Sequence, residues 1–494
     1  MLGGMRPGGW RPYFWHPYFW LCGFVALLGA LLLVYSQTLA FTWDEGFHLL
    51  AAQLIAAGKK PYLDFCFPQT TWNAYWVAAW MRIFGESWRL AHALAALLTT
   101  GGAMLAVDFV YTRLPASRWR MAAAFSAALL IGLNSAVFEH GAVGQAYGMC
   151  LFATVAAFRV AVAAKYREGA ALPALAGFLA GVAAASTLLS AAALPVLLVW
   201  VAMGKRWKRA AAFLAGALVP FLPTLWLFAR APRQTWFNLF EYHLHYRIVN
   251  WPDATQHDFE VLISWLDSGH ALLLILLAAA GLLVVRAGTE WRPGVRSEFY
   301  LCGALALAIG AEVSATHPTF PRYYLLVVPF AAIFAAAGYY GAGTRLGGSV
   351  RPLWPTLVFG LLMAFGCAKM LYERRDVYTW SDLEQVARKV REVTPAKAPL
   401  WADESIYFLT RHAPPSGMEF GYSHTIADLT PQRAAQLHIL SEAEVKRLVE
   451  AGAYATVETC DLDTDFIDSL ELPKLYRQTA EIANCGVYWD RVRP

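Results

Sequence analysis

The chain has 494 residues, of which 58% are hydrophobic and 15% are charged, and its formal net charge is +5. Soluble domains carry roughly 25% charged residues, so this composition excludes an ordinary soluble protein and predicts a polytopic α-helical membrane protein. The basic residues lie mainly in short connections between apolar runs. The positive charge therefore indicates no nucleic-acid partner.

The first apolar run covers residues 21–35 and follows a segment rich in aromatic and basic residues. Aromatic residues of this kind suit a membrane interface. The run also has the length of a signal peptide, and a weak small-residue cleavage site occurs at 38–40. We expect an uncleaved first span, because cleavage would separate the acidic segment that follows from its anchor.

Further apolar runs of about 17 to 22 residues are long enough to cross about 30 Å of hydrocarbon. We predict about eleven spans, of which the fifth and sixth form one hairpin with its tip at 186–190. The predicted limits are 18–40, 89–111, 119–138, 145–164, 171–187, 188–204, 209–229, 270–286, 298–315, 322–341 and 352–372.

Alternate connections between these spans differ in their content of basic residues, which concentrate on the cytoplasmic side of membrane proteins. The segment with Arg6 and Arg11, and the connections with Arg113, Lys205 and Arg345, belong to the basic set. This pattern predicts a multi-pass membrane protein with a cytoplasmic N-terminus. Residues 41–88, 230–269 and the tail would lie outside the cytoplasm.

The chain divides into a predicted transmembrane domain, 1–372, and a small extracytoplasmic α/β domain, 373–494. Apolar residues of the tail recur at helical spacing at 383, 386, 390 and 393. Ser441 and Glu444 form a capping-box pattern before a helix that Gly452 ends. Strands are predicted at 398–402, 453–459 and 486–492. Cys460 and Cys485 in this domain are either a disulfide or two free thiols.

The most unusual segment is 41–64, which follows the first span and places Asp44 and Glu45 at its end. Acids at a span end are costly unless they are used. Asp44 could be a helix-capping residue favoured by the helix dipole, or a carboxylate general base. His48 lies four residues later, on the same helical face, where it is either a partner of Asp44 or a hydrogen-bonded structural residue.

Other connections predicted on the same side also carry polar side chains that suit a binding site: Gln145 and Tyr147, then His243, His245 and Arg247, then His317, Arg322 and Tyr323. Lys59, Lys60 and Arg322 are either interfacial anchors or phosphate ligands. The connection 230–269 is either a lid or an amphipathic cover. This clustering indicates an enzyme working at the membrane surface.

Two other classes of function stay open at this point. A transporter or flippase of a lipid-linked sugar would place charges near the membrane midplane, whereas Asp108, Arg159 and Glu312 lie toward span ends. Alternatively, the tail is a binding module on a membrane anchor. The outward clustering of polar residues favours the enzyme.

Several segments resemble those of the GT-C membrane glycosyltransferases, a group related to dolichyl-phosphate-mannose protein mannosyltransferases and lipid A aminoarabinose transferases. The resemblance covers roughly residues 18 to 372. It is carried by D-E-G-F-H from Asp44, by A-A-G-K-K-P-Y-L-D-F, by H-G-A-V-G-Q-A-Y and by H-P-T-F-P-R-Y-Y. The tail matches the exported domain of such enzymes only loosely.

The resemblance implies a donor sugar on polyprenyl phosphate, transferred with inversion to a lipid, glycan or protein hydroxyl on the outer face. Asp44 falls on the catalytic acid of the group, Glu45 is its partner, and Asp64 falls on a second loop carboxylate. In aminoarabinose transferases a Lys follows that carboxylate, whereas Phe65 follows it here. The phosphate contact then moves to Lys59, Lys60 or Arg322.

The resemblance further implies that residues 72–83 form a helix lying in the interface, in agreement with a length too short to span. No cofactor is certain. A divalent metal is one option, held by Asp44, Asp64 and His48. The expected partners are the lipid-linked donor, the bilayer and the acceptor.

Overall fold

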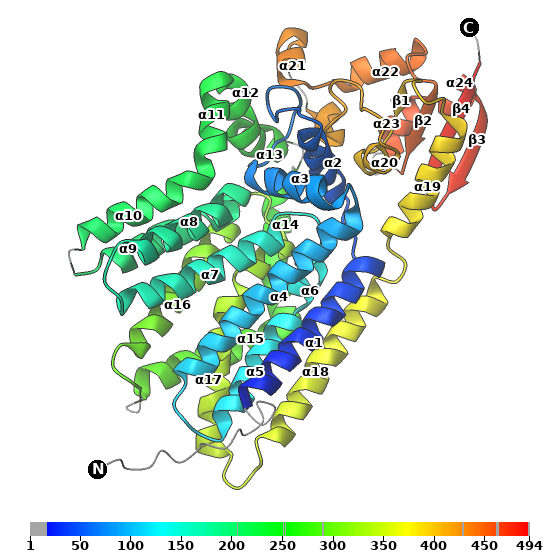
Figure 1. Cartoon of the computed structure of the whole chain (residues 1–494). Coiled ribbons are helices and arrows are strands. Elements are labelled where there is room, and N and C mark those ends of the chain that lie inside the picture. Colours follow the sequence, from blue (N-terminus) through cyan, green and yellow to red (C-terminus); the bar gives the residue numbers. More distant parts are fainter. Residues whose placement is uncertain are drawn as a thin grey trace, which may run out of the picture.

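The computed structural model describes residues 17–492, except 205, 250, 252, 289–290, 427–428 and 461–463. Arg6, Arg11 and Lys205, which contribute to the predicted orientation, lie outside the described residues. Long helices form a bundle, and shorter helices with a four-stranded sheet lie at one end of it (Figure 1). We call this end the capped end, and the end where α1 begins the open end.

Seven helical segments among the described residues are long and apolar enough to cross a membrane. They are α1 (Pro17–Thr38), α4 (Trp88–Arg113), α7 (Tyr147–Lys165), α10 (Trp207–Leu218) continued by η3 (Val219–Phe221) and α11 (Leu222–Arg230), α15 (Gly269–Ala287), α16 (Val295–Ser314) and α18 (Leu353–Glu373).

Four further helices coincide with the remaining predicted spans: α5 (Trp119–Gly132), α8 (Ala171–Ser186), α9 (Ala193–Ala202) and α17 (Val328–Leu346). The 3-10 turn η2 (Leu188–Ser190) forms the predicted tip between α8 and α9. The predicted span 119–138 is shorter than expected, because α5 ends at Gly132. Asn134 then caps a separate helix, α6 (Ser135–His140), by accepting a hydrogen bond from the Val137 N–H.

Small residues bring the helices of the bundle close together. A Cβ added to Gly177 of α8 would lie 1.9 Å from the Phe213 carbonyl oxygen of α10. A Cβ added to Gly281 of α15 would lie equally close to the Phe334 carbonyl of α17. Such small-residue contacts replace the hydrophobic driving force that helices lack in lipid. Leu361 and Phe365 of α18 are exposed instead, as expected of a lipid-facing surface.

Short elements between the spans form the layer at the capped end. They are α2 (Glu45–Ala56), α3 (Trp72–Phe84), α12 (Pro232–Trp236), the π-helix η4 (Phe237–Tyr246), α13 (Arg247–Val249), α14 (Ala254–Asp267) and the 3-10 segment η5 (Pro321–Leu326). The predicted helix at 72–83 is therefore present. At 1.5 Å per residue it is roughly 20 Å long, too short to cross a bilayer.

The C-terminal part contains four strands in the order β1-β2-β4-β3, with β1 and β2 parallel and the other pairs antiparallel. They are β1 (Leu400–Trp401), β2 (Thr456–Thr459), β3 (Tyr476–Ile482) and β4 (Cys485–Arg491). Its helices are α19 (Trp380–Val393), α20 (Glu404–Thr410), η6 (Gly421–Thr425), α21 (Pro431–Leu437), α22 (Glu442–Glu450), α23 (Thr464–Ser469) and α24 (Leu472–Leu475).

Three of the strands are those predicted, and β3 was missed because it is an edge strand whose side chains are mostly exposed. Ala483 and Asn484 turn β3 into β4 with positive φ angles of 50° and 60°, as a two-residue hairpin requires. Cys460 and Cys485 form a disulfide, which settles the alternative left open by the sequence.

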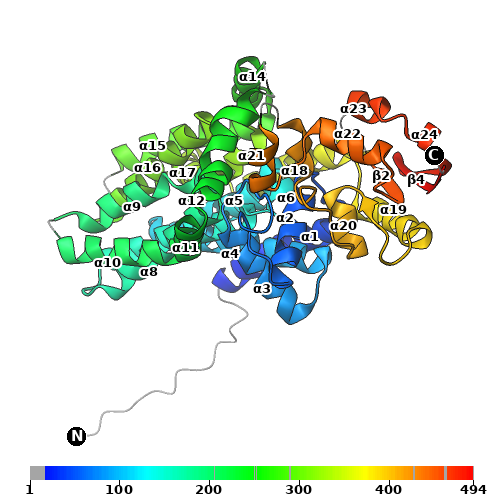
Figure 2. The ribbon, with the colours of Figure 1, turned by 90° about the horizontal axis from the view of Figure 1, so that it is seen from above.

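Figure 2, viewed from the capped end, shows the C-terminal elements over one side of the bundle and α8, α9 and α10 at the other side. The join is made by α19. Trp380 is fully buried and stacks on Trp88 of α4 at 5.5 Å between ring centroids. Glu384 accepts hydrogen bonds from the Trp88 indole at 2.9 Å and from Arg89 at 2.5 Å.

Candidate functional site

Asp44 is the N-cap residue of α2, directly after the end of α1. Its side chain makes no capping hydrogen bond. Its Oδ2 accepts a hydrogen bond from Arg322 Nη2 at 2.7 Å, and 24% of the Arg322 side chain and 29% of the Asp44 side chain are exposed. The structure therefore shows an ion pair rather than the capping alternative, and the pair is open enough to meet a ligand.

Arg322 lies on η5, which links α16 to α17. Its guanidinium carbon lies 4.5 Å from the ring centroid of Phe320 and 5.8 Å from that of Tyr323. Tyr147, the first residue of α7, interacts with the same guanidinium. Arg322 is thus held between aromatic rings, a cation–π arrangement that fixes its plane.

Five buried polar atoms near this ion pair lack a hydrogen-bond partner: Thr42 Oγ1, His48 Nδ1, His140 Nδ1, Gln145 Oε1 and Arg322 Nε. Folded proteins leave few such atoms, and each one calls for an explanation. They come from the start of α2, from α6, from the connection to α7 and from η5. Their gathering around one carboxylate indicates a site that receives a polar ligand.

The two histidines of this group have lowered pKa values, which favour the neutral imidazole at pH 7. The pKa is lowered to about 4 for His48 and to about 3 for His140, in both cases mainly by burial and partly by the charge of Arg322. His48 stacks against Phe47 and meets the edge of Phe67. A neutral imidazole has one nitrogen that donates a hydrogen bond and one that accepts. This combination suits the hydroxyl groups of a sugar.

Glu45 differs sharply from its neighbour, because it is fully buried and both of its oxygens are used. Oε1 lies 2.5 Å from His92 Nε2 and accepts the Gly144 N–H at 2.6 Å. Oε2 accepts the indole N–H of Trp380 at 3.1 Å. Glu45 therefore links α2 to α4, to the connection before α7 and to the C-terminal domain. Because both of its oxygens are engaged, it is better suited to holding these elements in place than to transferring a proton.

The π-helix η4 ends at Tyr246, and Arg247, the next residue, lies beside this group. Arg247 Nη2 donates to the Tyr323 hydroxyl at 2.8 Å, and its guanidinium carbon lies 5.2 Å from the Phe320 ring. A second cation thus faces the aromatic residues that hold Arg322. Extended π-helices are rare and often occur at functional sites.

The histidines of η4 have other surroundings. His243 Nε2 lies 2.8 Å from the Pro68 carbonyl oxygen, and burial lowers the pKa of this histidine to about 4. His245 is exposed, with its ring against Tyr246. Of the three residues predicted in this segment, His243, His245 and Arg247, it is Arg247 that contacts residues around Asp44.

Lys59, Lys60 and Asp64 form a separate loop that contacts the C-terminal domain. Lys59 pairs with Glu419 at 3.7 Å. Asp64 Oδ2 accepts the Lys60 N–H at 2.7 Å, while the side chains of Lys60 and Asp64 are exposed. Of the three phosphate ligands considered from the sequence, the structure therefore brings Arg322 to Asp44.

His317 pairs away from Asp44. Its Nδ1 lies 2.6 Å from Asp258 Oδ2 of α14, and Asp258 Oδ1 accepts the Thr319 N–H at 2.6 Å. His257 of the same helix lies 3.0 Å from the Thr319 carbonyl oxygen. Helix α14 therefore holds the connection that leads to Arg322.

The predicted metal ligands do not converge. Among the described residues, one group of three potential ligands lies close together, Glu458, Cys460 and Cys485. Two of its members form the disulfide. The ligand atoms of Asp44, Asp64 and His48 do not meet around one point in this way.

The sequence did not reveal that the C-terminal domain contributes to the site. A Cβ on Gly46 of α2 would lie 2.5 Å from Ser405 Oγ, so α20 packs directly on α2. Glu404 and Tyr422 of this domain interact electrostatically with Asp44. Burial raises the pKa of Glu404 to about 7, and the charges of Asp403 and Asp44 add to the shift. From the sequence, Glu404 is indistinguishable from an ordinary acid at a helix start.

No protein-family model and no curated protein sequence matches this chain. The crystal structure of ArnT from Cupriavidus metallidurans bound to undecaprenyl phosphate has a similar fold, with a TM-score of 0.64, 16% identity, and coverage of 95% of this chain and 98% of that chain. Its apo state gives the same values.

The oligosaccharyltransferase of Archaeoglobus fulgidus, in complex with Zn and sulfate, matches with a TM-score of 0.51 and 16% identity over 91% of this chain and 69% of that chain. At this identity the likeness concerns the fold. The predicted fold class is confirmed: a polytopic α-helical bundle of GT-C type that carries a small C-terminal α/β domain. The resemblance noted in the sequence is thereby confirmed at the level of the fold.

Proposed function

We propose that this protein is a membrane glycosyltransferase that moves a sugar from a polyprenyl-phosphate donor to an acceptor hydroxyl. The observation that carries the proposal is the group of buried, unpartnered polar atoms around the Asp44–Arg322 pair. The group lies at one end of a bundle whose fold is shared with a protein crystallised with undecaprenyl phosphate. The same site could serve a lipid, a glycan or a protein acceptor.

Asp44 acts as the general base in this mechanism. It takes the proton of the acceptor hydroxyl while that oxygen attacks the anomeric carbon of the donor. The bond from that carbon to the phosphate oxygen breaks, and its electron pair leaves with the lipid phosphate. One direct displacement inverts the anomeric centre, and one carboxylate is enough because no covalent intermediate forms.

Arg322 and Arg247 bind the phosphate that departs, because guanidinium groups match phosphate oxygens in charge and geometry. Arg322 is paired with Asp44 in the structure. A donor phosphate that recruits Arg322 would weaken this pair and release the carboxylate for the proton. Binding of the donor and activation of the base are coupled in this way.

The remaining predicted site residues divide by their positions. His48, Gln145 and Tyr147 face the ion pair and are assigned to the sugar, and Tyr323 orients the two arginines. Glu404 and Tyr422 form the wall on the C-terminal side. The other predicted residues are assigned no direct contact with the substrate, because they are exposed or bind other parts of the chain: Glu45, Lys59, Lys60, Asp64, His243, His245 and His317.

The proposal places the capped end outside the cytoplasm of a bacterial inner membrane, with residues 1–372 as the membrane domain and 373–494 as an extracytoplasmic domain. The basic connections at the open end support this orientation. Because this chain has Phe65 where aminoarabinose transferases carry a Lys, the resemblance does not identify the sugar or the acceptor. Mass spectrometry of envelope glycans and glycolipids from a deletion strain would identify them.

The decisive test is Asp44→Asn in the purified protein, supplied with radiolabelled polyprenyl-phosphate sugar and envelope acceptors. Loss of a general base lowers the rate by roughly 10²- to 10⁴-fold, and we expect transfer to fall by that amount while folding is unchanged. Asp64→Asn is the matched control, because it removes an exposed carboxylate of the same loop. Near-full transfer by Asp44→Asn would refute the assignment.

The same assay separates the enzyme from a flippase. In reconstituted vesicles, movement of intact donor across the bilayer without cleavage of the sugar–phosphate bond would favour the flippase. Two of the three charged residues noted in the spans, Asp108 and Arg159, pair with each other, and Glu312 accepts a backbone N–H from Ala192 at 3.0 Å. Asp108 also accepts a hydrogen bond from the Tyr18 hydroxyl at 2.9 Å.

A further inference from the structure

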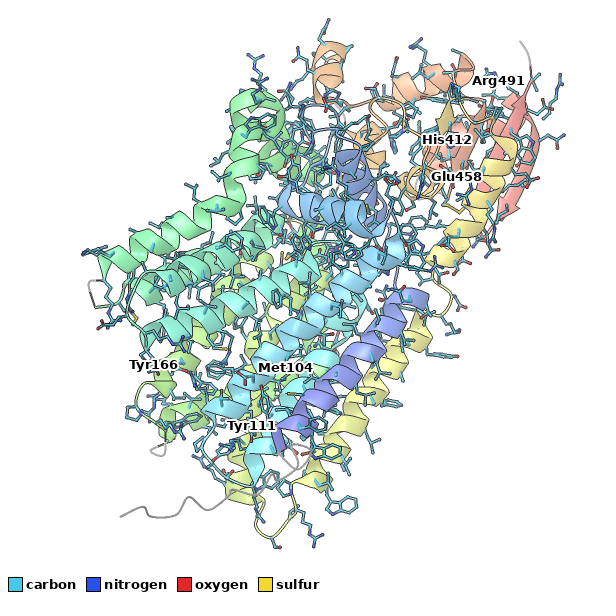
Figure 3. The ribbon with its side chains drawn as sticks, in the orientation of Figure 1. Met104, Tyr111, Tyr166, His412, Glu458 and Arg491 are labelled. Carbon is cyan, nitrogen blue, oxygen red and sulfur yellow. A yellow bond between two sulfur atoms is a disulfide. The ribbon has the colours of Figure 1, made fainter. Side chains whose placement is uncertain are left out.

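A second polar site lies at the open end of the bundle, far from the candidate active site. Figure 3 shows Tyr166 at this end and Glu458 and Arg491 of the C-terminal domain at the other. A pocket of about 220 Å³ opens beside Tyr166, where α7, α9, α10 and α16 meet. Its volume corresponds to roughly seven water molecules, enough for a small polar headgroup.

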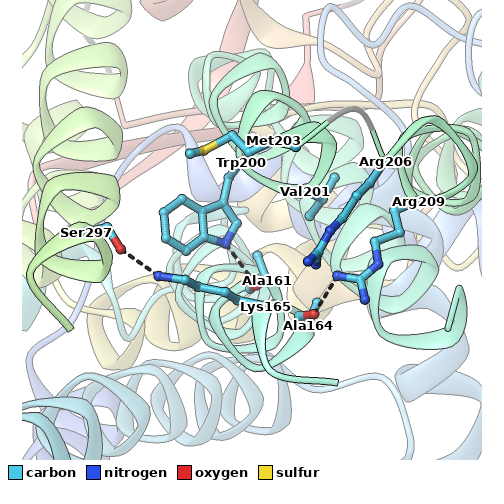
Figure 4. A pocket seen from close by; sticks show the side chains of 10 residues that line it. Ala161, Ala164, Lys165, Trp200, Val201, Met203, Arg206, Arg209 and Ser297 are labelled. Atoms are coloured by element: carbon cyan, nitrogen blue, oxygen red, sulfur yellow. Dashed lines mark hydrogen bonds between the residues drawn. The ribbon is translucent and has the colours of Figure 1, made fainter. Parts of the chain in front are cut away.

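The polar lining of this pocket is basic (Figure 4). Lys165, Arg206 and Arg209 supply three positive charges from three different segments. Lys165 Nζ donates to Ser297 Oγ at 2.7 Å, and Arg209 Nη1 donates to the Ala164 carbonyl at 2.9 Å. These groups are oriented by neutral acceptors.

In the part of the chain that the structure describes, Lys165, Arg206 and Arg209 form no ion pair. The nearby Glu298 is already occupied by Arg113 at 2.6 Å and by the Tyr166 hydroxyl. A concave surface with several cations and no neutralising carboxylate attracts an anion.

The surroundings indicate that the anion is attached to a lipid. Trp200 lines the pocket, and Lys165 Nζ lies 5.2 Å from its ring. Met203, which lines the pocket, is exposed, as is Trp207 at the start of α10. Val199 of α9 and Leu214 and Leu218 of α10 are exposed apolar residues of the helices that form the pocket. A headgroup in the pocket would therefore have its acyl chains on a surface that already faces lipid.

We propose that this pocket binds the headgroup phosphate of an anionic diacyl phospholipid. Basic pockets between transmembrane helices recognise such headgroups, and each nearby Lys or Arg strengthens the attraction. The ring of Trp200 anchors the ligand at the level of the interface. This site is separate from the proposed transfer reaction and does not rest on it.

The test is lipid binding by the full-length protein, delipidated in mild detergent and measured by native mass spectrometry. Phosphatidylglycerol and phosphatidylcholine with identical acyl chains are the probes, and inorganic phosphate is the competitor. We expect phosphatidylglycerol to bind roughly tenfold more tightly than phosphatidylcholine. The double variant Lys165→Met/Arg206→Glu should abolish this preference.

The matched control is Arg345→Met/Arg351→Glu, which changes the net charge equally at two exposed positions, one in the last turn of α17 and one in the connection to α18. It should keep the preference. Arg206→Glu alone is informative if Lys165→Met impairs folding, because Arg206 is exposed and makes no internal ion pair. A preserved preference in Arg206→Glu, an equal loss in the control, or displacement by millimolar inorganic phosphate would each overturn the proposal.

Discussion

The two ends of the bundle both gather charged residues, but in opposite ways. At the capped end a carboxylate and a guanidinium pair with each other, and buried polar atoms around them lack partners. At the open end three cations line one pocket, two of them bound to carbonyl and hydroxyl oxygens, and none of the three forms an ion pair among the described residues. The first arrangement suits a reaction in which a proton and a phosphate move, whereas the second suits binding of an anion.

The ends also differ in how they are covered. The hydrophobic core around α2 and α3 is continuous with that of the C-terminal domain, so the site at Asp44 is built jointly by both. The pocket at the open end is formed by helix ends and by the connection between α9 and α10. Variants in the contact between α19 and the bundle should therefore disturb the site at the capped end and leave the pocket at the open end unchanged.

Trp380→Ala should give the largest effect. The indole is fully buried, stacks on Trp88 and donates to Glu45, and truncation of a buried Trp costs roughly 3–5 kcal/mol. We expect a lower unfolding temperature and faster proteolysis between α18 and α19. Phosphatidylglycerol binding should persist under conditions where the protein stays folded. Simultaneous loss of both would show that the two ends are not independent.

Glu404→Gln tests the contribution of the C-terminal domain through pH. The pKa of Glu404 is raised to about 7, so the folded state holds a proton that the unfolded chain releases near pH 4.5. Stability should then decrease as pH rises from about 4.5 to 7. The variant should remove roughly 1–3 kcal/mol of this decrease. Chemical denaturation at pH 5 and 7.5 measures it, and identical pH profiles would contradict the burial of this carboxyl.

Arg322→Lys should raise the donor KM by about tenfold, because an ammonium cannot bind phosphate in the forked geometry of a guanidinium. Transfer kinetics at varied donor concentration measure this change. Arg206→Lys at the open end is the matched control and should leave KM unaffected. If Arg322→Lys also left it unaffected, the phosphate contact would lie elsewhere.

Lys59→Met should have the smallest effect. Its ion pair with Glu419 is 3.7 Å long, and 40% of the lysine side chain is exposed, so solvent screening limits the contribution to below about 1 kcal/mol. Thermal unfolding should shift slightly, and transfer should fall less than threefold. A loss of transfer as large as that of Asp44→Asn would instead place Lys59 on the donor phosphate.

The sequence by itself determined the membrane class, the positions of the spans and most elements of the C-terminal domain. Apolar runs and capping patterns are local properties, and hydrocarbon leaves a chain few alternatives to helices. The same local reasoning singled out the acids that follow the first span. It could not separate the roles of Asp44 and Glu45, because both follow the same span and both are charged.

Tertiary structure made that separation. Successive residues of a helix point about 100° apart, so Asp44 turns toward Arg322, 278 residues away, while Glu45 turns inward to His92, Gly144 and Trp380. Glu404 reaches the same neighbourhood from a different domain. These partners are distant in sequence, and only the packing of α2 between the bundle and α20 decides which acid lies beside Arg322 and which is buried.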